Sequence, residues 1–173
     1  MKAKGEGRKA KTEGKVSKRK AEAEGALVFA YGSNLRVEQM LARCPSATVV
    51  TTARLVGHGL AFVGFSRTWG GSVATVVVDP NDSVDGVLYR VTSADLAGLD
   101  AFEGAPLVYT RAMCRFAGGL RAWVYYHAPA SPRGPSYRYF AAVVEGRARF
   151  GYSAAPAVDA AERAVTQSAD APF

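Results

Sequence analysis

Two short stretches of this 173-residue chain combine residue types that could perform chemistry. The first is the run Tyr31-Gly32-Ser33-Asn34-Leu35, which lies between an apolar segment and an expected helix. A strand that turns through Gly-Ser-Asn into a helix leaves several backbone N–H groups without partners, and we expect them to point into one concavity. Such a turn can hold a carboxylate or a phosphate. The same pattern is also typical of an ordinary turn that Ser or Asn caps.

The second candidate is Glu103, an acidic residue on the apolar face of an expected helix. Leu96, Leu99 and Glu103 are spaced i, i+3 and i+7, which places all three on one side of a helix. Burial and the negative end of the helix dipole both raise the pKa of a carboxylate, and a raised pKa near neutrality suits general acid–base catalysis. The alternative is a glutamate that reaches solvent or pairs with an arginine, for example Arg111 or Arg115.

A mostly antiparallel sheet with a few helices is expected to position these residues. Apolar runs bounded by Gly, Pro, Asn or Asp predict strands, and a spacing of i, i+3, i+4 predicts helices. The strands follow one another without regular helical crossovers, which favours an α+β fold with a curled sheet. The predicted strands are 27–31, 48–56, 60–66, 72–78, 84–91, 108–116 and 121–127, and the predicted helices are 37–44, 92–103, 135–150 and 156–165.

Positive charge is concentrated at the start of the chain. The net charge is +7, and residues 1–25 contain nine Lys or Arg and four Glu. This segment has too few apolar residues to form a core, so we predict a disordered basic tail over 1–25 and one domain over 26–173. The tail either contacts nucleic acid or only raises solubility, and it has no aromatic residue to stack on bases. Deleting it should abolish salt-sensitive nucleic-acid binding only in the first case.

Missing motifs disfavour several other functions. The sequence has no GxGxxG, P-loop or HExxH pattern, so we expect no cofactor and no metal ion. His58 and His127 lie on different expected strands, and we interpret both as structural. No stretch approaches the roughly 18 apolar residues that a membrane span needs, and no apolar segment typical of a signal peptide follows the basic start. Two cysteines without CxxC spacing, Cys44 and Cys114, predict buried free thiols and a cytoplasmic location.

Several of these segments together resemble the gamma-glutamylcyclotransferase family. The run 31–35 looks like the family's signature loop, and Leu99-Asp100-Ala101-Phe102-Glu103-Gly104 is similar to the segment where the family places its catalytic glutamate. The stretch 150–165 is only loosely similar, and the basic tail has no counterpart. The other matching residues are Met40, Arg43, Cys44, Pro45, Leu60-Ala61-Phe62, Trp69 to Thr75, Val84 to Tyr89, Pro135-Ser136 and Tyr139, so the resemblance covers residues 27–150.

The resemblance implies a small mixed barrel-like sheet with flanking helices, and an enzyme that cyclises a gamma-glutamyl group to 5-oxoproline. In such a reaction the glutamyl α-amine attacks its own side-chain carbonyl and an amine or amino acid leaves, which needs no cofactor and no protein nucleophile. Glu103 is implied as the general base that then acts as the general acid. The residues implied to bind this small-molecule gamma-glutamyl substrate are Tyr31, Gly32, Ser33, Asn34, Leu35 and Tyr139, the last through its hydroxyl.

Two other functions are compatible with the sequence. One is a specialised cyclotransferase that removes the gamma-glutamyl group from a larger amine, such as a biosynthetic intermediate or a lysine side chain. The other is a non-catalytic domain that binds a small anion and carries a polyanion-binding tail. An acid at position 103 on the apolar face favours an enzyme, because a pure binding protein has no need to bury a carboxylate. The sequence makes no prediction of the oligomeric state.

Overall fold

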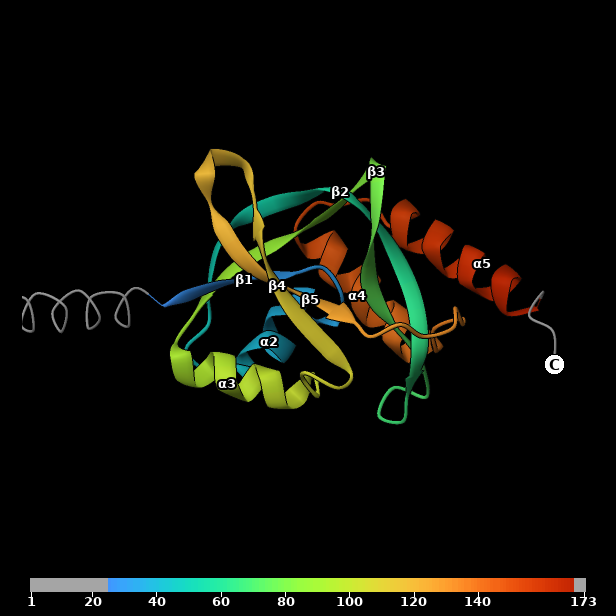
Figure 1. Ribbon diagram of the computed structural model, residues 1–173, viewed down its shortest axis with the longest axis horizontal. Helices are drawn as coiled ribbons and strands as arrows, with labels where there is room; N and C mark the ends of the chain where they lie inside the picture. Colours follow the sequence, from blue (N-terminus) through green and yellow to red (C-terminus); the bar gives the residue numbers. More distant parts are fainter. Residues whose placement is uncertain (1–24, 170–173) are drawn as a thin grey trace, which may run out of the picture.

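The computed structural model describes residues 25–169, and a five-stranded sheet forms its centre (Figure 1). The strand order is β2-β3-β1-β5-β4, in which β1 and β5 pair parallel and all other pairs are antiparallel. The predicted α+β fold with a mostly antiparallel sheet is therefore confirmed. The predicted tail lies outside the described residues, apart from Gly25. The elements are β1 (Ala26–Ala30), η1 (Ser33–Leu35), α2 (Val37–Arg43), β2 (Thr48–Ser66), β3 (Gly71–Val91), α3 (Ser93–Phe102), β4 (Tyr109–Arg115), η2 (Ala117–Gly119), β5 (Arg121–His127), α4 (Tyr137–Arg149) and α5 (Ala155–Ala169).

Two long strands replace the four shorter ones that were predicted. β2 and β3 each run through two predicted strands, and they pair with each other antiparallel. Between them the register shifts, so that Gly57, with a φ of 77°, lies opposite residues 79–82. The prediction of four strands was wrong because turn-forming residues such as Pro80 lie in this bulge, which bends a strand without ending it.

Helix α3 brings Glu103 close to the carboxyl ends of β1 and β5. It starts after Thr92, whose side chain accepts the backbone N–H of Asp95, while the Asp95 side chain accepts the N–H of Thr92. This reciprocal arrangement gives hydrogen-bond acceptors to two backbone N–H groups that would otherwise lack a partner at the start of the helix. The helix ends at Glu103, and Gly104 follows with a φ of 63°. Because glycine adopts this left-handed conformation at little cost, the helix ends there and the carboxylate occupies its last turn.

The two C-terminal helices pack against β2 and against the loop after β1. α4 begins at Tyr137, two residues later than predicted, because Ser136 caps it by accepting a backbone N–H. α5 is longer than the predicted helix and lies beside β2 (Figure 1). Gly146 of α4 packs directly on η1, since a Cβ at this position would lie 2.5 Å from the Cβ of Leu35. This close approach ties α4 to the loop that follows β1.

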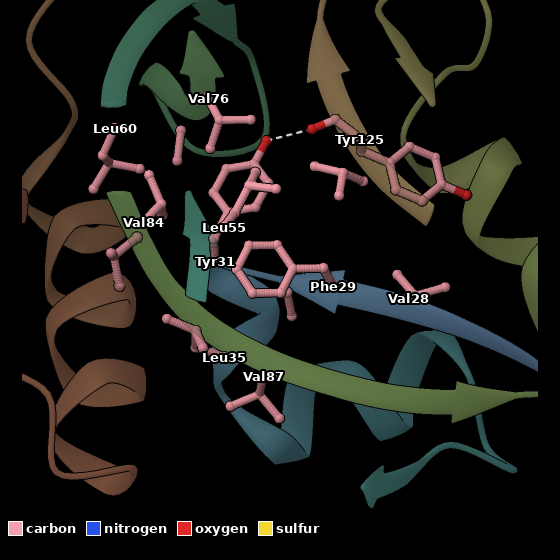
Figure 2. Packing of buried hydrophobic residues seen from close by; sticks show 14 of the residues in the cluster. Val28, Phe29, Tyr31, Leu35, Leu55, Leu60, Val76, Val84, Val87 and Tyr125 are labelled. Carbon is pink, nitrogen blue, oxygen red and sulfur yellow. Dashed lines mark hydrogen bonds between the residues drawn. The ribbon is translucent and has the colours of Figure 1, made fainter. Parts of the chain in front are cut away.

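The hydrophobic core holds β1 and the loop after it (Figure 2). Phe29 is 2% exposed, and its ring packs against Phe116 with the centroids 4.9 Å apart. Leu35 is fully buried in the same cluster. The hydroxyl of Tyr31 donates a hydrogen bond to the backbone carbonyl of Tyr125, which is the dashed line in Figure 2. The loop 31–35 is therefore fixed at both of its ends.

Two further findings concern the predicted absence of membrane spans and the cysteines. None of the helices within residues 25–169 has the length and apolar character needed to cross a bilayer. Both cysteines are free, and Cys44 is buried as predicted. Cys114 is only partly buried, and its Sγ lies 3.0 Å from the hydroxyl of Tyr126.

Candidate active site

A cavity of about 460 Å³ contains nearly all of the predicted site residues. It lies at the carboxyl ends of β1 and β5. These two strands run parallel, so both end on the same side of the sheet. The loop after β1 forms one wall, and the end of α3 forms another. The predicted site residues that line it are Tyr31, Gly32, Ser33, Asn34, Glu103 and Tyr139.

The carboxylate of Glu103 is held on one oxygen only. Arg43 Nη1 lies 3.1 Å from Glu103 Oε1, and Asn34 Nδ2 donates to the same oxygen at 3.2 Å. The other oxygen, Oε2, has no partner among residues 25–169 and is reached by solvent. The Glu103 side chain is 15% exposed. One carboxylate oxygen is thus fixed by the protein, while the other is open to a bound molecule.

The environment of Glu103 shifts its titration in the direction that the sequence predicts. Burial raises the pKa of Glu103 above its ordinary value, while the positive charge of Arg43 and the hydrogen bond from Asn34 act in the opposite direction. Desolvation disfavours the charged form, and a cation close by favours it. A carboxylate whose pKa is raised by burial and lowered by a nearby cation can take up a proton and give it back within one reaction.

Helix α2 supplies the groups that hold this arrangement in place. Gln39 and Arg43 are four residues apart, so they share one face of the helix. The Oδ1 atom of Asn34 accepts from Arg43 Nη1 at 3.0 Å and from Gln39 Nε2 at 3.1 Å. Gln39 Nε2 also lies 2.7 Å from Ser33 Oγ. The loop and Glu103 are therefore joined through one hydrogen-bonded network.

The arginines suggested as partners of Glu103 are the wrong ones. Arg111 pairs instead with Asp100 at 3.2 Å and lies over the ring of Trp123. Arg115 is exposed at the far end of the β4–β5 hairpin. The true partner, Arg43, is 60 residues away in the sequence. No periodicity connects positions so distant, and only the family resemblance included Arg43.

Three buried tyrosines form the inner wall. The hydroxyl of Tyr139 accepts the backbone N–H of Ala74 at 3.0 Å, and the hydroxyl of Tyr109 donates to the carbonyl of the same residue at 2.9 Å. Burial raises the pKa of Tyr139 to about 12 and those of Tyr31 and Tyr109 well above the usual value, so all three are neutral phenols at neutral pH. Gly32 lies against this wall, because a Cβ there would be 3.1 Å from the Tyr139 hydroxyl.

The loop differs from its prediction in two respects. Leu35 does not line the cavity and packs in the core instead. Its backbone N–H donates to the carbonyl of Gly32 at 3.0 Å, and that of Arg36 donates to Ser33 at 3.1 Å. The loop therefore offers fewer open N–H groups than predicted, because its residues form a 3-10 turn that uses two of them.

Several residues that line the cavity were not predicted to do so from the sequence. His127 was interpreted as structural, and its ring does pack on Tyr109 with centroids 4.9 Å apart, but it also forms part of the cavity wall. Phe65 and Trp69 also line the cavity, and of these two only Trp69 belongs to a segment that resembles the family. Within the described part of the chain, no three His, Cys, Asp or Glu side chains are grouped as a metal site requires.

Comparison with known proteins gives consistent matches. A family model described as gamma-glutamyl cyclotransferase, AIG2-like, matches residues 28–142. Gamma-glutamylcyclotransferase of Bos taurus is 40% identical over 90 residues, which are 50% of this chain and 48% of that protein. The Homo sapiens protein of the same name is 41% identical over 85 residues, 47% and 45% of the two chains. The matched stretch thus spans about half the length of these curated relatives.

Solved structures match over a larger share of the chain. A structure titled gamma-glutamyl cyclotransferase has a TM-score of 0.68 and 28% identity, covering 80% of this chain and 85% of that one. An uncharacterized protein from Homo sapiens has a TM-score of 0.68 and 29% identity, covering 87% and 90%. The fold, and not only the matched sequence segment, is therefore shared with these proteins.

Proposed function

We propose, because this chain belongs to the AIG2-like gamma-glutamyl cyclotransferase family, that it cyclises a gamma-glutamyl group to 5-oxoproline and releases the attached amine. The observation that carries the proposal is the state of Glu103. Its carboxylate lies in the cavity, held through Oε1 by Asn34 and Arg43, with Oε2 open. The relatives named gamma-glutamylcyclotransferase support the same reaction.

The reaction exchanges one bond to nitrogen for another at the same carbon. The new bond joins the α-nitrogen to the γ-carbonyl carbon, and the bond that breaks joins this carbon to the leaving nitrogen. If the α-nitrogen starts as an ammonium, the two protons it loses end on the leaving amine, which departs as an ammonium. No water is consumed. In this proposal Glu103 Oε2 accepts a proton from the α-nitrogen and returns it to the leaving nitrogen.

The inner wall of the cavity supports binding of the glutamyl end. The 3-10 turn does not use the backbone N–H groups of Gly32 and Asn34, and we assign these two groups to the substrate α-carboxylate. The hydroxyl of Tyr139 accepts the N–H of Ala74 and also contacts Ser33, and we assign it to the substrate as a further hydrogen-bonding group of this wall. A substrate held by these groups is folded with its amine near its own carbonyl, which supplies the proximity that cyclisation needs.

The test is 5-oxoproline release from gamma-glutamyl-alanine, gamma-glutamyl-leucine and gamma-glutamyl-lysine isomers. Glu103→Gln should lower kcat/KM by about 10²- to 10⁴-fold, because the amide accepts no proton, while the fold is retained. Glu162→Gln is the matched control, since Glu162 is exposed on α5 and does not line the cavity. Full activity of Glu103→Gln refutes the role of Glu103, and no release by the folded wild type refutes the reaction.

The proposal also covers the cofactor requirement, the cellular location and the role of residues 1–25. Cyclisation needs no cofactor, since substrate and base supply every atom and proton. Both cysteines are free thiols, which fits a reducing compartment, and we place the enzyme in the cytoplasm. Nucleic-acid binding through residues 1–25 stays a prediction, with the deletion described above as its test.

A further inference from the structure

Three polar side chains from β2, β4 and β5 form a chain of contacts that the proposed reaction does not use. Cys114 Sγ lies 3.0 Å from the hydroxyl oxygen of Tyr126, and that oxygen lies 3.4 Å from Nε2 of His58. The rings of His58 and Tyr126 also pack together, with their centroids 5.9 Å apart. All three residues are partly exposed. We call them the Cys–Tyr–His cluster.

The cluster lies apart from the cavity that contains Glu103. Tyr125 and His127 line that cavity, and Tyr126 stands between them in β5. Because successive side chains of a strand point to opposite faces, Tyr126 points away from the cavity. All members of the cluster are outside the set of described residues that line it. The chemistry of the cluster can therefore be tested separately from cyclisation.

The direction of each hydrogen bond in the cluster can be assigned. The backbone carbonyl of Val56 lies 3.1 Å from His58 Nδ1, and because a carbonyl oxygen can only accept, Nδ1 carries the hydrogen. In a neutral imidazole Nε2 is then an acceptor, so the Tyr126 hydroxyl donates to it. Tyr126 has no second hydrogen to give, and its oxygen accepts the thiol hydrogen of Cys114. The thiol proton thus has a path to a base.

Tyr126 is suited to pass a proton on rather than to hold a negative charge. Burial, together with the contact to Cys114, raises the pKa of Tyr126 above its ordinary value, so it is a neutral phenol at neutral pH. When the phenol oxygen takes up the thiol proton, its own proton moves to the imidazole. An imidazole accepts a proton readily near neutral pH. A nucleophile, a base and a group that orients the base are therefore in line.

The second cysteine has different surroundings. Cys44 is fully buried, and its Sγ lies 3.5 Å from the backbone carbonyl of Asp95. Burial raises the pKa of Cys44 to about 11, so it remains a covered thiol at neutral pH. Thiols of this kind are inert, because the thiolate is the form that reacts. Cys44 therefore provides an unreactive reference within the same chain.

We propose that Cys114 is a reactive thiol, which His58 deprotonates through Tyr126, and that it exchanges with small-molecule disulfides. The Cys114 sulfur attacks one sulfur of the disulfide, so a new S–S bond joins Cys114 to that half while the original S–S bond breaks. The other half leaves with the electron pair as a thiolate. The thiol proton is held on His58 and then passes to that thiolate or to water. One disulfide replaces another, so no further oxidant is needed.

The test follows the reaction of the full chain with the aromatic disulfide DTNB, whose released thiolate is coloured. Cys114→Ser identifies the phase that belongs to Cys114, since serine keeps a hydrogen-bonding group beside Tyr126. We expect Tyr126→Phe and His58→Gln each to slow this phase by about ten-fold or more, because each interrupts the path of the proton. Tyr137→Phe is the matched control, since Tyr137 is 87% exposed on α4, and it should keep the wild-type rate.

A purely structural cluster predicts an effect of the opposite sign. If the Tyr126 hydroxyl only covers the sulfur, its removal exposes Cys114, and the reaction stays the same or becomes faster. Near-UV circular dichroism and thermal unfolding show which variants are folded. An unchanged or faster Cys114 phase in either folded variant overturns the proposal, and so does a wild-type Cys114 that reacts no faster than Cys44. None of these outcomes depends on the proposed cyclisation.

Discussion

Replacing Arg43 by methionine removes the cation from the carboxylate of Glu103 while keeping a long apolar side chain. The ion pair spans 3.1 Å, and its side chains are 18% and 15% exposed, so solvent screens it only weakly. A hydrogen bond to a charged group contributes about 1.5–3 kcal/mol, and each 1.36 kcal/mol corresponds to about one decade in an equilibrium constant. Proton uptake by Glu103 should therefore become easier by roughly one to two decades.

The sign of the effect on activity follows from the proposed role of Glu103 as a base. Burial raises the pKa of Glu103 and Arg43 counteracts this rise, so removing Arg43 moves the pKa further upward. The acidic limb of kcat/KM then shifts to higher pH. On the acidic limb we expect kcat/KM of Arg43→Met to be up to about 10- to 100-fold below wild type, with a smaller deficit at pH values above the limb. Arg43→Lys keeps the positive charge, so its acidic limb should lie close to the pH of the wild-type limb.

The assay is 5-oxoproline release from gamma-glutamyl-leucine over a pH series with both variants and wild type. The substrate amine titrates identically in all three, so the shift between them reports the enzyme. Near-UV circular dichroism and thermal unfolding show whether each variant is folded. If a folded Arg43→Met keeps the wild-type acidic limb, then the Arg43–Glu103 pair does not control the base, and the reasoning is refuted.

Three further substitutions test how the site is supported. Gly32→Ala places a methyl group 3.1 Å from the Tyr139 hydroxyl, so KM should rise several-fold while thermal stability changes little; an unchanged KM contradicts a binding role for this turn. Gly146→Ala pushes α4 against Leu35 and should lower the unfolding free energy by about 1–3 kcal/mol in urea titration. Thr92→Ala removes the cap of α3 and should cost about 1 kcal/mol in the same titration, with wild-type kcat in the folded protein.

Local patterns were sufficient for much of the fold. The apolar run of β1, the hairpin of β4 and β5, and the helix that carries Glu103 could each be predicted from a few neighbouring residues. The lengths of β2 and β3 could not be predicted in this way, because Gly57 and the residues opposite it have the composition of a turn. Whether such a segment reverses the chain or bulges depends on the pairing of the partner strand, which composition does not describe.

The candidate site divides in the same way. The loop 31–34, Glu103 and Tyr139 were named from the sequence, and the structure brings them into one cavity. Leu35 was named with them but turns to the core, since consecutive residues of a tight turn face different directions. Arg43 was matched to the family pattern without a role, because its contact with Glu103 arises only when α2 and the end of α3 pack side by side.

Sequence alone determined what is local in this protein: the strand and helix types, the turn after β1, and an acid on an apolar helical face. These properties depend on neighbours within one or two turns of chain. Tertiary structure alone decided which arginine balances Glu103 and which of its two carboxylate oxygens stays open. Charge pairing and desolvation depend on distances in space, and those distances exist only after segments 60 or more residues apart have packed together.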